Sequence, residues 1–281
     1  MKRHFFGATG RAVPVIGQGT WNIDEAPRAR ALEALRAGLD CGLQHIDTAE
    51  MYGSGAAEAV VGEAIHGRRS DVFLVSKVLP SNASRRGAQD ACERSLKALG
   101  TDYLDCYLLH WRGSVPLEET FEAFERLLKE GKIRAYGVSN FDVVDLNEAF
   151  SLVGPGKLAC NQVLYHLRER AIEHAVIPWC RRNNVAVVAY SPFGHDDFPE
   201  RGSPAGKVLD EIAQEHEAGA RQIALAFLTS QNGVFAIPKA ADLAHVRENA
   251  QAGNITLTPQ QVIRLDQAFP RGCRPDYLPM I

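Results

Sequence analysis

Short apolar runs alternate with longer amphipathic stretches along the whole chain. Runs such as Val72–Ser76 and Val185–Ala189 are apolar on both faces, which predicts strands of a parallel sheet covered by helices. The predicted strands are Pro14–Gln18, Leu43–Ile46, Val72–Ser76, Tyr103–Leu109, Ile133–Val138, Leu158–Asn161, Val185–Ala189 and Val234–Ile237. The predicted helices lie near 27–40, 57–66, 84–99, 118–130, 142–150, 172–183, 205–216, 220–231, 242–251 and 259–268.

The alternation of eight predicted strands with helices favours a (β/α)8 TIM barrel, an α/β fold that suits a chain of 281 residues. Gly10 lies between two short apolar stretches, which predicts an N-terminal β-hairpin at the bottom of the barrel, and the last helical patterns predict extra C-terminal helices. A doubly wound dinucleotide fold would need GxGxxG after the first strand, but the segment 17–22 reads GQGTWN. Because we find neither a repeat nor a linker, we expect residues 1–281 to form one domain.

The composition narrows the class of function. Hydrophobic residues make up 46% of the chain, enough for a large core, and the formal net charge of −3 gives no electrostatic reason to expect a nucleic acid partner. The N-terminus lacks the apolar core of a signal peptide, and no apolar run approaches the roughly 20 residues that span a bilayer. The six cysteines have no CxxC or zinc spacing, which indicates reduced thiols. We therefore expect a cytoplasmic monomer with no membrane partner.

Polar residues stand at or just after the ends of seven predicted strands. Barrel enzymes place their chemistry at these carboxyl ends, because charges inside the strands would destabilise the core. Each residue also has a purely structural interpretation: residues 47–50, DTAE, match a helix capping box, and His110 before Trp111 is typical of a hydrogen-bonded core histidine. These interpretations are independent, so they do not explain why all seven ends are polar. The residues are Asp47, Lys77, His110, Ser139, Asn140, Asn161, Gln162, Tyr190, Ser191 and Lys239.

Asp47, Tyr52, Lys77 and His110 together fit proton transfer by a phenol. A free tyrosine has a pKa of about 10, and a neighbouring ammonium favours the phenolate, so we expect Lys77 to lower the pKa of Tyr52 towards neutrality. Asp47 would hold that ammonium, and His110 would donate a hydrogen bond to a substrate oxygen. Such a set protonates a carbonyl oxygen while hydride reaches the carbon, and because side chains cannot supply hydride, a nicotinamide cofactor is implied. The chain has no HxH, HExxH or GxSxG pattern, so we expect neither a metal site nor a serine hydrolase.

At this point the motifs, in their order, resemble the aldo-keto reductase family over nearly the whole chain. They are GQGTW at 17–21, DTAEMYG at 47–53, SK at 76–77, LLHW at 108–111, GVSN at 137–140, NQ at 161–162, YSP at 190–192 and IPKA…HVREN at 237–249. The resemblance implies a barrel that reduces aldehydes or ketones with NADPH. It implies that Tyr52 is the general acid, that Lys77 and Asp47 tune it, and that His110 orients the carbonyl.

The same resemblance implies a cofactor site. Ser139, Asn140 and Gln162 would hold the carboxamide of the nicotinamide, and Tyr190 would stack on its ring. The positions implied for cofactor binding are Gly19, Thr20, Trp21, Asp47, Ser139, Asn140, Gln162, Tyr190, Ser191, Lys239, Ala240, His245, Glu248 and Asn249. Two of them depart from the commonest family pattern, because Ala240 replaces a serine and His245 replaces an arginine, and both usual residues contact the 2′-phosphate of NADP. Lys239 remains, so we expect NADPH, with NADH as the alternative.

The substrate pocket is expected to have walls formed by Trp21, Tyr52, His110, Trp111 and Phe193. The chain is similar to a bacterial branch of the family, including methylglyoxal-reducing and diketogulonate-reductase-like members, so small carbonyls and 2-oxoaldehydes such as methylglyoxal are the favoured substrates. Two alternatives remain open. One is a Schiff-base lyase that uses Lys77, and the other is a non-catalytic NADP(H)-binding redox sensor of the same fold.

Overall fold

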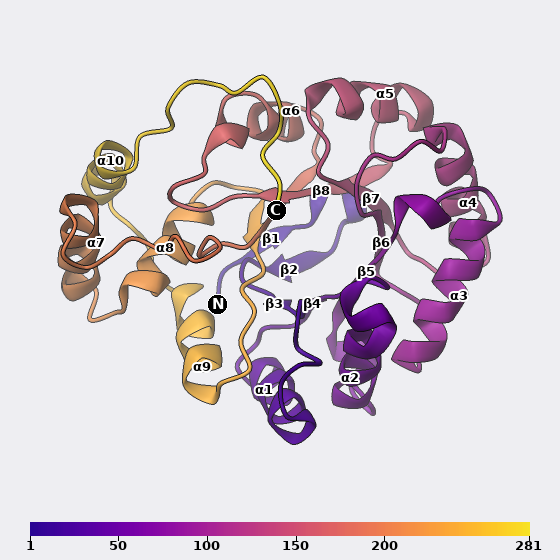
Figure 1. The fold of residues 1–281 in the computed structure, drawn as a ribbon, viewed down its shortest axis with the longest axis horizontal. Helices are drawn as coiled ribbons and strands as arrows, with labels where there is room; N and C mark the ends of the chain where they lie inside the picture. The colour runs from indigo at the N-terminus through magenta and orange to yellow at the C-terminus, as the bar shows by residue number, and fades with distance from the viewer.

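A computed structural model describes residues 1–281, and an eight-stranded parallel sheet lies at its centre (Figure 1). Each strand lies beside the next strand of the chain, from the first to the last. Bridges from Ile16 to Ala236 and from Gly19 to Lys239 join the first strand to the last and close the sheet, which confirms the predicted barrel. The strands are β3 (Gln18–Gly19), β4 (His45–Asp47), β5 (Phe73–Val78), β6 (Cys106–Leu109), β7 (Tyr136–Ser139), β8 (Leu158–Leu164), β9 (Ala186–Tyr190) and β10 (Val234–Ala236).

Helices form a ring around the barrel (Figure 1). They are α1 (Arg28–Asp40), α2 (Ala56–Ala64), α3 (Gly87–Leu99), α4 (Leu117–Lys129), α5 (Val143–Val153), α6 (Val176–Arg182), α7 (Pro204–Glu215), α8 (Ala220–Leu228), α9 (Leu243–Ala252) and α10 (Pro259–Ala268). The predicted helix 259–268 coincides with α10. Helices α7 and α10 lie side by side, and Arg264 of α10 forms ion pairs with Glu211 and Glu215 of α7.

The prediction of one strand over Pro14–Gln18 was wrong. Pro14 ends β2 (Ala12–Pro14), which pairs antiparallel with β1 (Arg3–Phe5) in the predicted hairpin, and the barrel strand β3 begins only at Gln18. The chain changes from one sheet to the other within this apolar run. A periodicity of two residues does not reveal such a change, because residues on both sides of it are buried.

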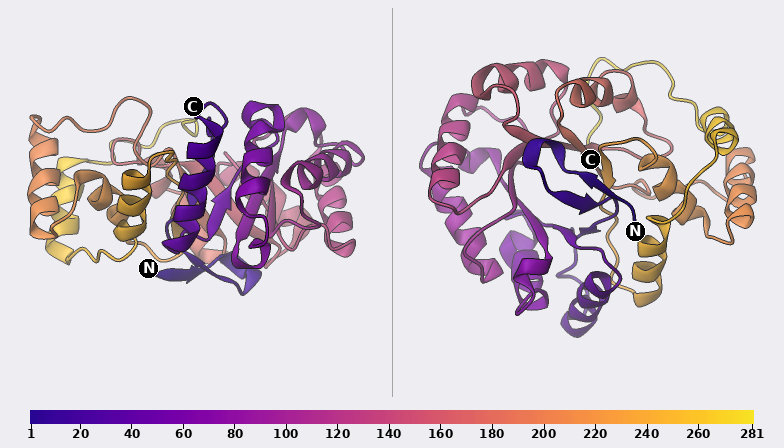
Figure 2. Two further views of the ribbon diagram at one scale, coloured as in Figure 1. Left: turned by 90° about the horizontal axis from the view of Figure 1, so that it is seen from below. Right: turned by 180° about the vertical axis from the view of Figure 1, so that it is seen from behind.

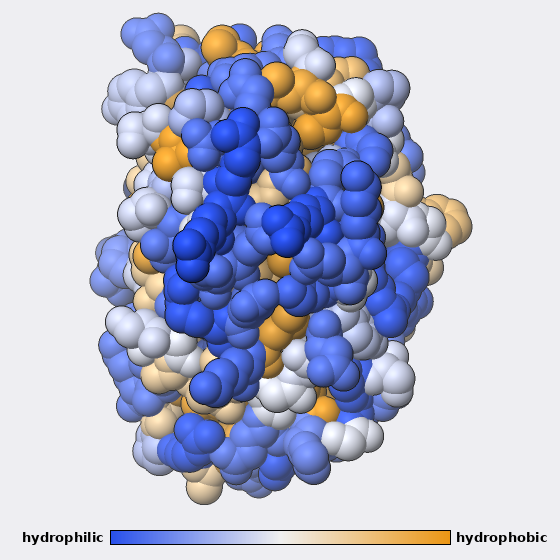
Figure 3. Space-filling view, turned by 90° about the vertical axis from the view of Figure 1, so that its right-hand side faces the viewer, coloured by the Kyte–Doolittle hydropathy of each residue, from blue (hydrophilic) through white to orange (hydrophobic).

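The helices cover the sheet because each has one apolar face. In α4, Leu117, Phe121 and Phe124 are buried, while Glu118 and Glu122 are exposed. The outer surface on the α3 and α4 side is accordingly mostly hydrophilic (Figure 3). A cluster of 65 buried hydrophobic residues fills the space between the sheet and the helices, so this layer carries most of the core.

The interior of the barrel has its own smaller core, which the hairpin completes. Figure 2 shows the hairpin at the end of the barrel opposite the C-terminus of the chain. Phe6, between β1 and β2, is fully buried, and its ring centroid lies 4.7 Å from that of Phe73 and 5.1 Å from that of Phe235. His45 lies among the same three rings without a hydrogen-bond partner, and burial lowers the pKa of its imidazole to about 4. Aromatic packing therefore fills this end of the barrel.

The six cysteines are unpaired thiols, and four of them are buried. Cys41 and Cys273 are exposed. No helix combines the length and the apolar character that crossing a membrane requires.

Replacing Phe6 with alanine should lower the free energy of unfolding by about 3–5 kcal/mol, because it leaves a cavity among Phe73, Phe235 and His45. The measurement is equilibrium denaturation by urea, followed by circular dichroism. The adjacent Phe5 is 68% exposed and provides a matched control. Phe5→Ala should change stability by less than about 0.5 kcal/mol. Equal effects of the two substitutions would contradict the role assigned to the hairpin.

Candidate active site

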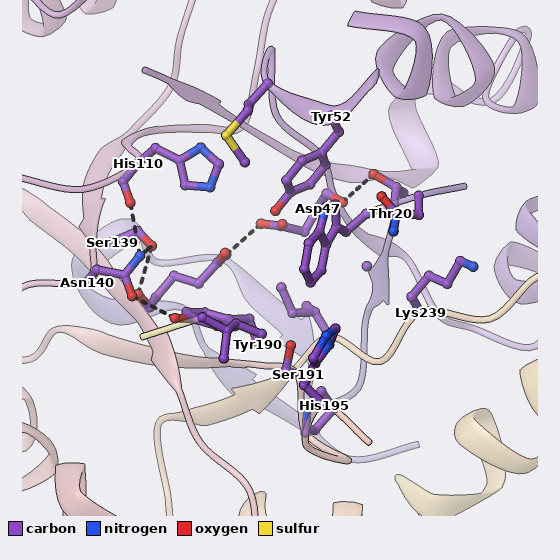
Figure 4. A pocket seen from close by; sticks show the side chains of 18 of the residues that line it. Thr20, Asp47, Tyr52, His110, Ser139, Asn140, Tyr190, Ser191, His195 and Lys239 are labelled. Carbon is purple, nitrogen blue, oxygen red and sulfur yellow. Dashed lines mark hydrogen bonds between the residues drawn. The ribbon is translucent and has the colours of Figure 1, made fainter. Parts of the chain in front are cut away.

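A cavity of about 350 Å³ opens at the carboxyl ends of the barrel strands (Figure 4). Of the polar residues predicted at the strand ends, all except Lys77 and Asn161 line this cavity. Residues of the loops that follow the strands also line it. The lining residues are Gly19, Thr20, Trp21, Asn22, Asp47, Met51, Tyr52, His110, Trp111, Ser139, Asn140, Gln162, Tyr190, Ser191, Pro192, Phe193, Gly194, His195, Ile237, Lys239 and Ile281.

A buried ion pair forms the floor of this cavity. Lys77 of β5 donates a hydrogen bond of 2.5 Å from its Nζ to Oδ1 of Asp47, which ends the neighbouring strand β4. The two side chains are 0% and 1% exposed. Gln162 Nε2 donates to the other oxygen of Asp47 at 2.7 Å, so both carboxylate oxygens accept a hydrogen bond. Such pairing is what keeps two charges stable away from water.

The lysine side chain is held by three oxygen atoms. Besides Asp47, its Nζ donates to the carbonyl oxygen of Thr48 at 2.8 Å and to the hydroxyl of Tyr52 at 3.1 Å. Burial by itself lowers the pKa of Lys77, but the charge of Asp47 and the phenol of Tyr52 outweigh burial and raise that pKa above its usual value. The amine therefore remains an ammonium at neutral pH, with all three protons directed at oxygens.

Tyr52 reaches the ammonium from the loop between β4 and α2. The residues that follow it, Gly53, Ser54 and Gly55, have φ angles of 55°, 53° and 93°. This left-handed run turns the chain sharply into α2, and glycine at two of the three positions reduces its conformational cost. The turn leaves the phenol pointing into the cavity rather than packed in the core (Figure 4).

The expectation that Lys77 lowers the pKa of Tyr52 overall was wrong. Burial raises the pKa of this phenol above its usual value, and the nearby ammonium opposes the rise without cancelling it. Tyr52 is consequently protonated at neutral pH. A protonated phenol beside a fixed cation has the properties of a proton donor, since the cation stabilises the phenolate that forms when the proton leaves.

His110 stands across the cavity from the ion pair, just after β6. Its ring centroid lies 5.8 Å from that of Tyr52, in an edge-to-face arrangement. Burial first, and the charge of Lys77 second, lower the pKa of the imidazole to about 2, so the ring is neutral. Its buried Nδ1 has no hydrogen-bond partner in the protein. A neutral ring with one N–H group is able to donate a hydrogen bond to an oxygen in the cavity.

Amide and hydroxyl groups make a polar wall beside this acid–base group. Tyr190 Oη donates to Oδ1 of Asn140 at 2.9 Å, and Asn140 Nδ2 donates to the hydroxyl of Ser139 at 3.2 Å. Ser139 in turn donates to the carbonyl oxygen of Gln162 at 2.9 Å. Asn140 has a φ of 60°, and asparagine tolerates this left-handed conformation better than most residues.

This wall fits a flat ring that carries a carboxamide. Tyr190 supplies an aromatic face, and Oε1 of Gln162 accepts no hydrogen bond within the protein while its Nε2 is bonded to Asp47. The residues present therefore match the requirements of a nicotinamide, which needs a stacking surface and hydrogen-bonding groups.

Several residues predicted for the site do not line the cavity. Lys77 lies beneath it, behind Asp47 and Tyr52. The predicted cofactor residues His245, Glu248 and Asn249 lie on α9, and Ala240 precedes that helix. His245 and Glu248 are exposed, whereas Asn249 is buried.

Other lining residues were not predicted from the sequence. Asn22, Met51 and Ile237 adjoin or nearly adjoin predicted residues, so their positions in the chain offered a signal. His195 and Ile281 come from loops with no recognisable pattern. The ring of His195 stacks on Trp21 with a centroid distance of 6.1 Å, and this contact joins the loop after β3 to the loop after β9.

The sequence and the fold of this chain are similar to those of known proteins. The model of the Aldo/keto reductase family matches residues 15–269. The chain is 49% identical over 261 residues to Methylglyoxal reductase YeaE of Escherichia coli (strain K12), covering 92% of each protein. It is 31% identical over 263 residues to Glyoxal reductase of Bacillus subtilis (strain 168), covering 92% of this chain and 89% of that protein. The crystal structure of an aldo-keto reductase from Klebsiella pneumoniae in complex with NADPH matches 100% of both chains, with a TM-score of 0.93 and 44% identity.

Replacing Lys77 with methionine should lower the free energy of unfolding by about 3–5 kcal/mol at neutral pH, because it leaves the carboxylate of Asp47 buried without its cation. Thermal and urea denaturation measure this loss. Lys157→Met is the matched control, since Lys157 is 45% exposed and pairs with Glu125 on the surface. The control should cost far less, because solvent screens exposed pairs. A Lys77→Met protein as stable as the control would contradict the importance of the buried pair.

Proposed function

The chain belongs to the aldo/keto reductase family, and on this premise we propose that it is an NADPH-dependent reductase of small carbonyl compounds in which Tyr52 is the general acid. The single observation that carries the proposal is the hydrogen-bonded series from Asp47 through Lys77 to the Tyr52 hydroxyl at the floor of the cavity. This series ends in the hydroxyl group of Tyr52, which faces the cavity beside the fixed positive charge of Lys77.

In the proposed reaction, a carbonyl oxygen lies between Tyr52 and His110. Tyr52 donates its proton to that oxygen, and the adjacent ammonium of Lys77 stabilises the resulting phenolate. His110, which is neutral, donates a hydrogen bond that orients the carbonyl and polarises it. Asp47 keeps the ammonium in place and supplies the charge that prevents it from losing its proton in a buried site.

The cofactor supplies the hydride when it is bound. We assign the carboxamide end of the nicotinamide to Ser139, Asn140 and Gln162, with Tyr190 against the ring. Support comes from the polar wall that these residues form and from the NADPH complex of the Klebsiella pneumoniae relative. The adenine end is assigned to Lys239 and to α9, where His245 stands in place of the arginine that the family more often has.

We propose 2-oxoaldehydes, methylglyoxal among them, as the substrate class. Two relatives carry names that refer to methylglyoxal and glyoxal, and the volume of the cavity, about 350 Å³, suits a small molecule beside the nicotinamide. Aromatic side chains line the opening, as the sequence predicts for the pocket wall. They are Trp21, Trp111 and Phe193.

The contacts of Lys77 argue against a Schiff-base lyase. Its amine is 0% exposed and donates to three oxygens, so it is neither accessible nor deprotonated as a nucleophile must be. A non-catalytic sensor would have no need for the phenol and ammonium to be hydrogen-bonded at 3.1 Å. The complete set of acid–base contacts favours a carbonyl reductase over either alternative.

NADPH oxidation by the purified protein should be observable with methylglyoxal and small aromatic aldehydes. Tyr52→Phe should reduce kcat by at least about a hundredfold, because it removes the proton donor, while NADPH still quenches protein fluorescence. Turnover is followed by the loss of NADPH absorbance. A Tyr52→Phe protein with unchanged turnover would refute the assigned acid. Reduction of bulky ketones together with inactivity towards methylglyoxal would refute the assigned substrate class.

Wild-type turnover should be faster with NADPH than with NADH at equal subsaturating concentration, because Lys239 is available to the 2′-phosphate. His245→Arg should lower the KM for NADPH on the order of tenfold, since a guanidinium forms charge-assisted hydrogen bonds with phosphate. The KM for NADH, which has no 2′-phosphate, serves as the internal control and should remain unchanged. An equal effect on both cofactors would place His245 away from the phosphate, and a wild-type preference for NADH would reverse the cofactor assignment.

A further inference from the structure

Glu50 has contacts that the acid–base chemistry described above does not use. Its side chain is 10% exposed, and its Oε1 accepts hydrogen bonds from the backbone N–H of Leu79 at 2.8 Å and from Nδ2 of Asn82 at 2.9 Å. Its Oε2 accepts one from Nη2 of Arg94 at 3.2 Å. The carboxylate therefore connects the loop that carries Tyr52 to the segment that follows Lys77.

The capping-box interpretation of residues 47–50 was wrong. In a capping box the acidic side chain returns to the backbone N–H of the first residue, and the first side chain caps the helix. Here the carboxylate of Asp47 binds Lys77 and Gln162 instead, and the carboxylate of Glu50 binds the neighbouring loop. The motif therefore connects two loops of the barrel rather than starting a helix.

The backbone reinforces this connection. The N–H of Thr48 donates to the carbonyl oxygen of Val75 at 2.9 Å, and the N–H of Glu50 donates to that of Lys77 at 3.3 Å. These bonds continue the pairing of β4 with β5 beyond the end of β4. The side chain of Glu50 extends this contact to two residues past Lys77, because it accepts a hydrogen bond from the backbone N–H of Leu79. The chain segments before Tyr52 and after Lys77 are thus held at a fixed separation.

The turn after Tyr52 orients the phenol, whereas residues before Tyr52 connect the loop to the segment that follows Lys77. Gly53, Ser54 and Gly55 adopt left-handed backbone conformations, and the two glycines have no side chain to pack. The side-chain connection to the segment after Lys77 is therefore made on the N-terminal side of the loop. Glu50 is two residues before Tyr52, on that side. Its side chain accepts two hydrogen bonds from the segment after Lys77, from Leu79 and Asn82, and a third from Arg94 of α3.

We propose that Glu50 is a positioning residue that holds the hydroxyl of Tyr52 at the ammonium of Lys77 by fixing the two loops that carry them. The proposal rests on the proposed function, since it concerns the geometry of proton donation. It predicts that loss of the link slows the chemical step and leaves ligand binding intact. Displacing a catalytic group by about 1 Å can cost on the order of a hundredfold in rate.

The donors around Glu50 define a graded series of substitutions. Glu50→Ala removes all three hydrogen bonds. Glu50→Gln keeps an oxygen for Leu79 and Asn82 but turns an amide N–H group towards the guanidinium of Arg94, so it should restore most of the rate. Relative to wild type, we expect kcat to fall on the order of thirtyfold to a hundredfold in Glu50→Ala and less than about fivefold in Glu50→Gln. KM for the carbonyl and the affinity for NADPH should change less than twofold, as for other losses confined to the chemical step.

A matched control separates positioning from general stability. Glu173 is 8% exposed and accepts hydrogen bonds from Arg170 and Tyr165, but it does not line the cavity. Glu173→Ala should lower the melting temperature by an amount similar to Glu50→Ala and leave kcat unchanged. Thermal denaturation, NADPH titration by fluorescence and steady-state kinetics are measured on the full-length wild-type, Glu50→Ala, Glu50→Gln and Glu173→Ala proteins.

The outcomes distinguish this proposal from the one on which it rests. If wild type turns over and Tyr52→Phe does not, while Glu50→Ala keeps a kcat within twofold of wild type, the positioning role is wrong and the proposed function stands. The positioning role is also wrong if Glu173→Ala loses as much kcat as Glu50→Ala, or if the loss appears in KM alone. Absence of wild-type turnover with every carbonyl tested overturns both proposals.

Discussion

The structure depends on one constraint, the need to neutralise a lysine and an aspartate that lie out of water at adjacent strand ends. Asp47 and Lys77 satisfy each other at 2.5 Å, and the remaining hydrogen-bonding capacity of the pair is taken up by Gln162, Thr48 and Tyr52. Each of these partners is thereby fixed relative to the ion pair. The ion pair therefore connects the ends of strands β4, β5 and β8 and the phenol of Tyr52 in one hydrogen-bonded group.

The two ends of the barrel differ in their packing: aromatic rings fill one end, and the other opens into a polar cavity. At one end Phe6 closes the interior with Phe73 and Phe235, and burial among these rings keeps His45 neutral. At the other end the strands finish on polar side chains that would destabilise the interior, and a cavity keeps them accessible. The barrel therefore combines an aromatic end with a polar end that carries the cavity.

Ionisation at the polar end is a balance between burial and charge. Burial raises the pKa of Tyr52 and lowers that of His110 to about 2, which leaves both groups uncharged at neutral pH. Lys77 keeps its charge because the partners that surround it outweigh the same burial. A cation beside two neutral hydrogen-bond donors stabilises the negative charge that develops on a carbonyl oxygen during reduction. The contacts of Glu50 add a geometric requirement. Proton donation needs the hydroxyl of Tyr52 at hydrogen-bond distance from the ammonium of Lys77, and Glu50 connects the segments that carry them.

The sequence by itself determined the alternation of strands and helices, the barrel and the polar residues at the strand ends, because these features record which positions avoid water. It also indicated that Asp47 and Lys77 meet, since consecutive parallel strands end side by side. Only the tertiary structure decided the direction of the Tyr52 pKa, which depends on how burial competes with a charge 3.1 Å away. It also decided that Pro14 belongs to the hairpin, that His195 and Ile281 line the cavity and that Glu50 binds the loop after β5. These depend on contacts between loops distant in sequence, and local hydrophobic patterns carry no information about which loops meet.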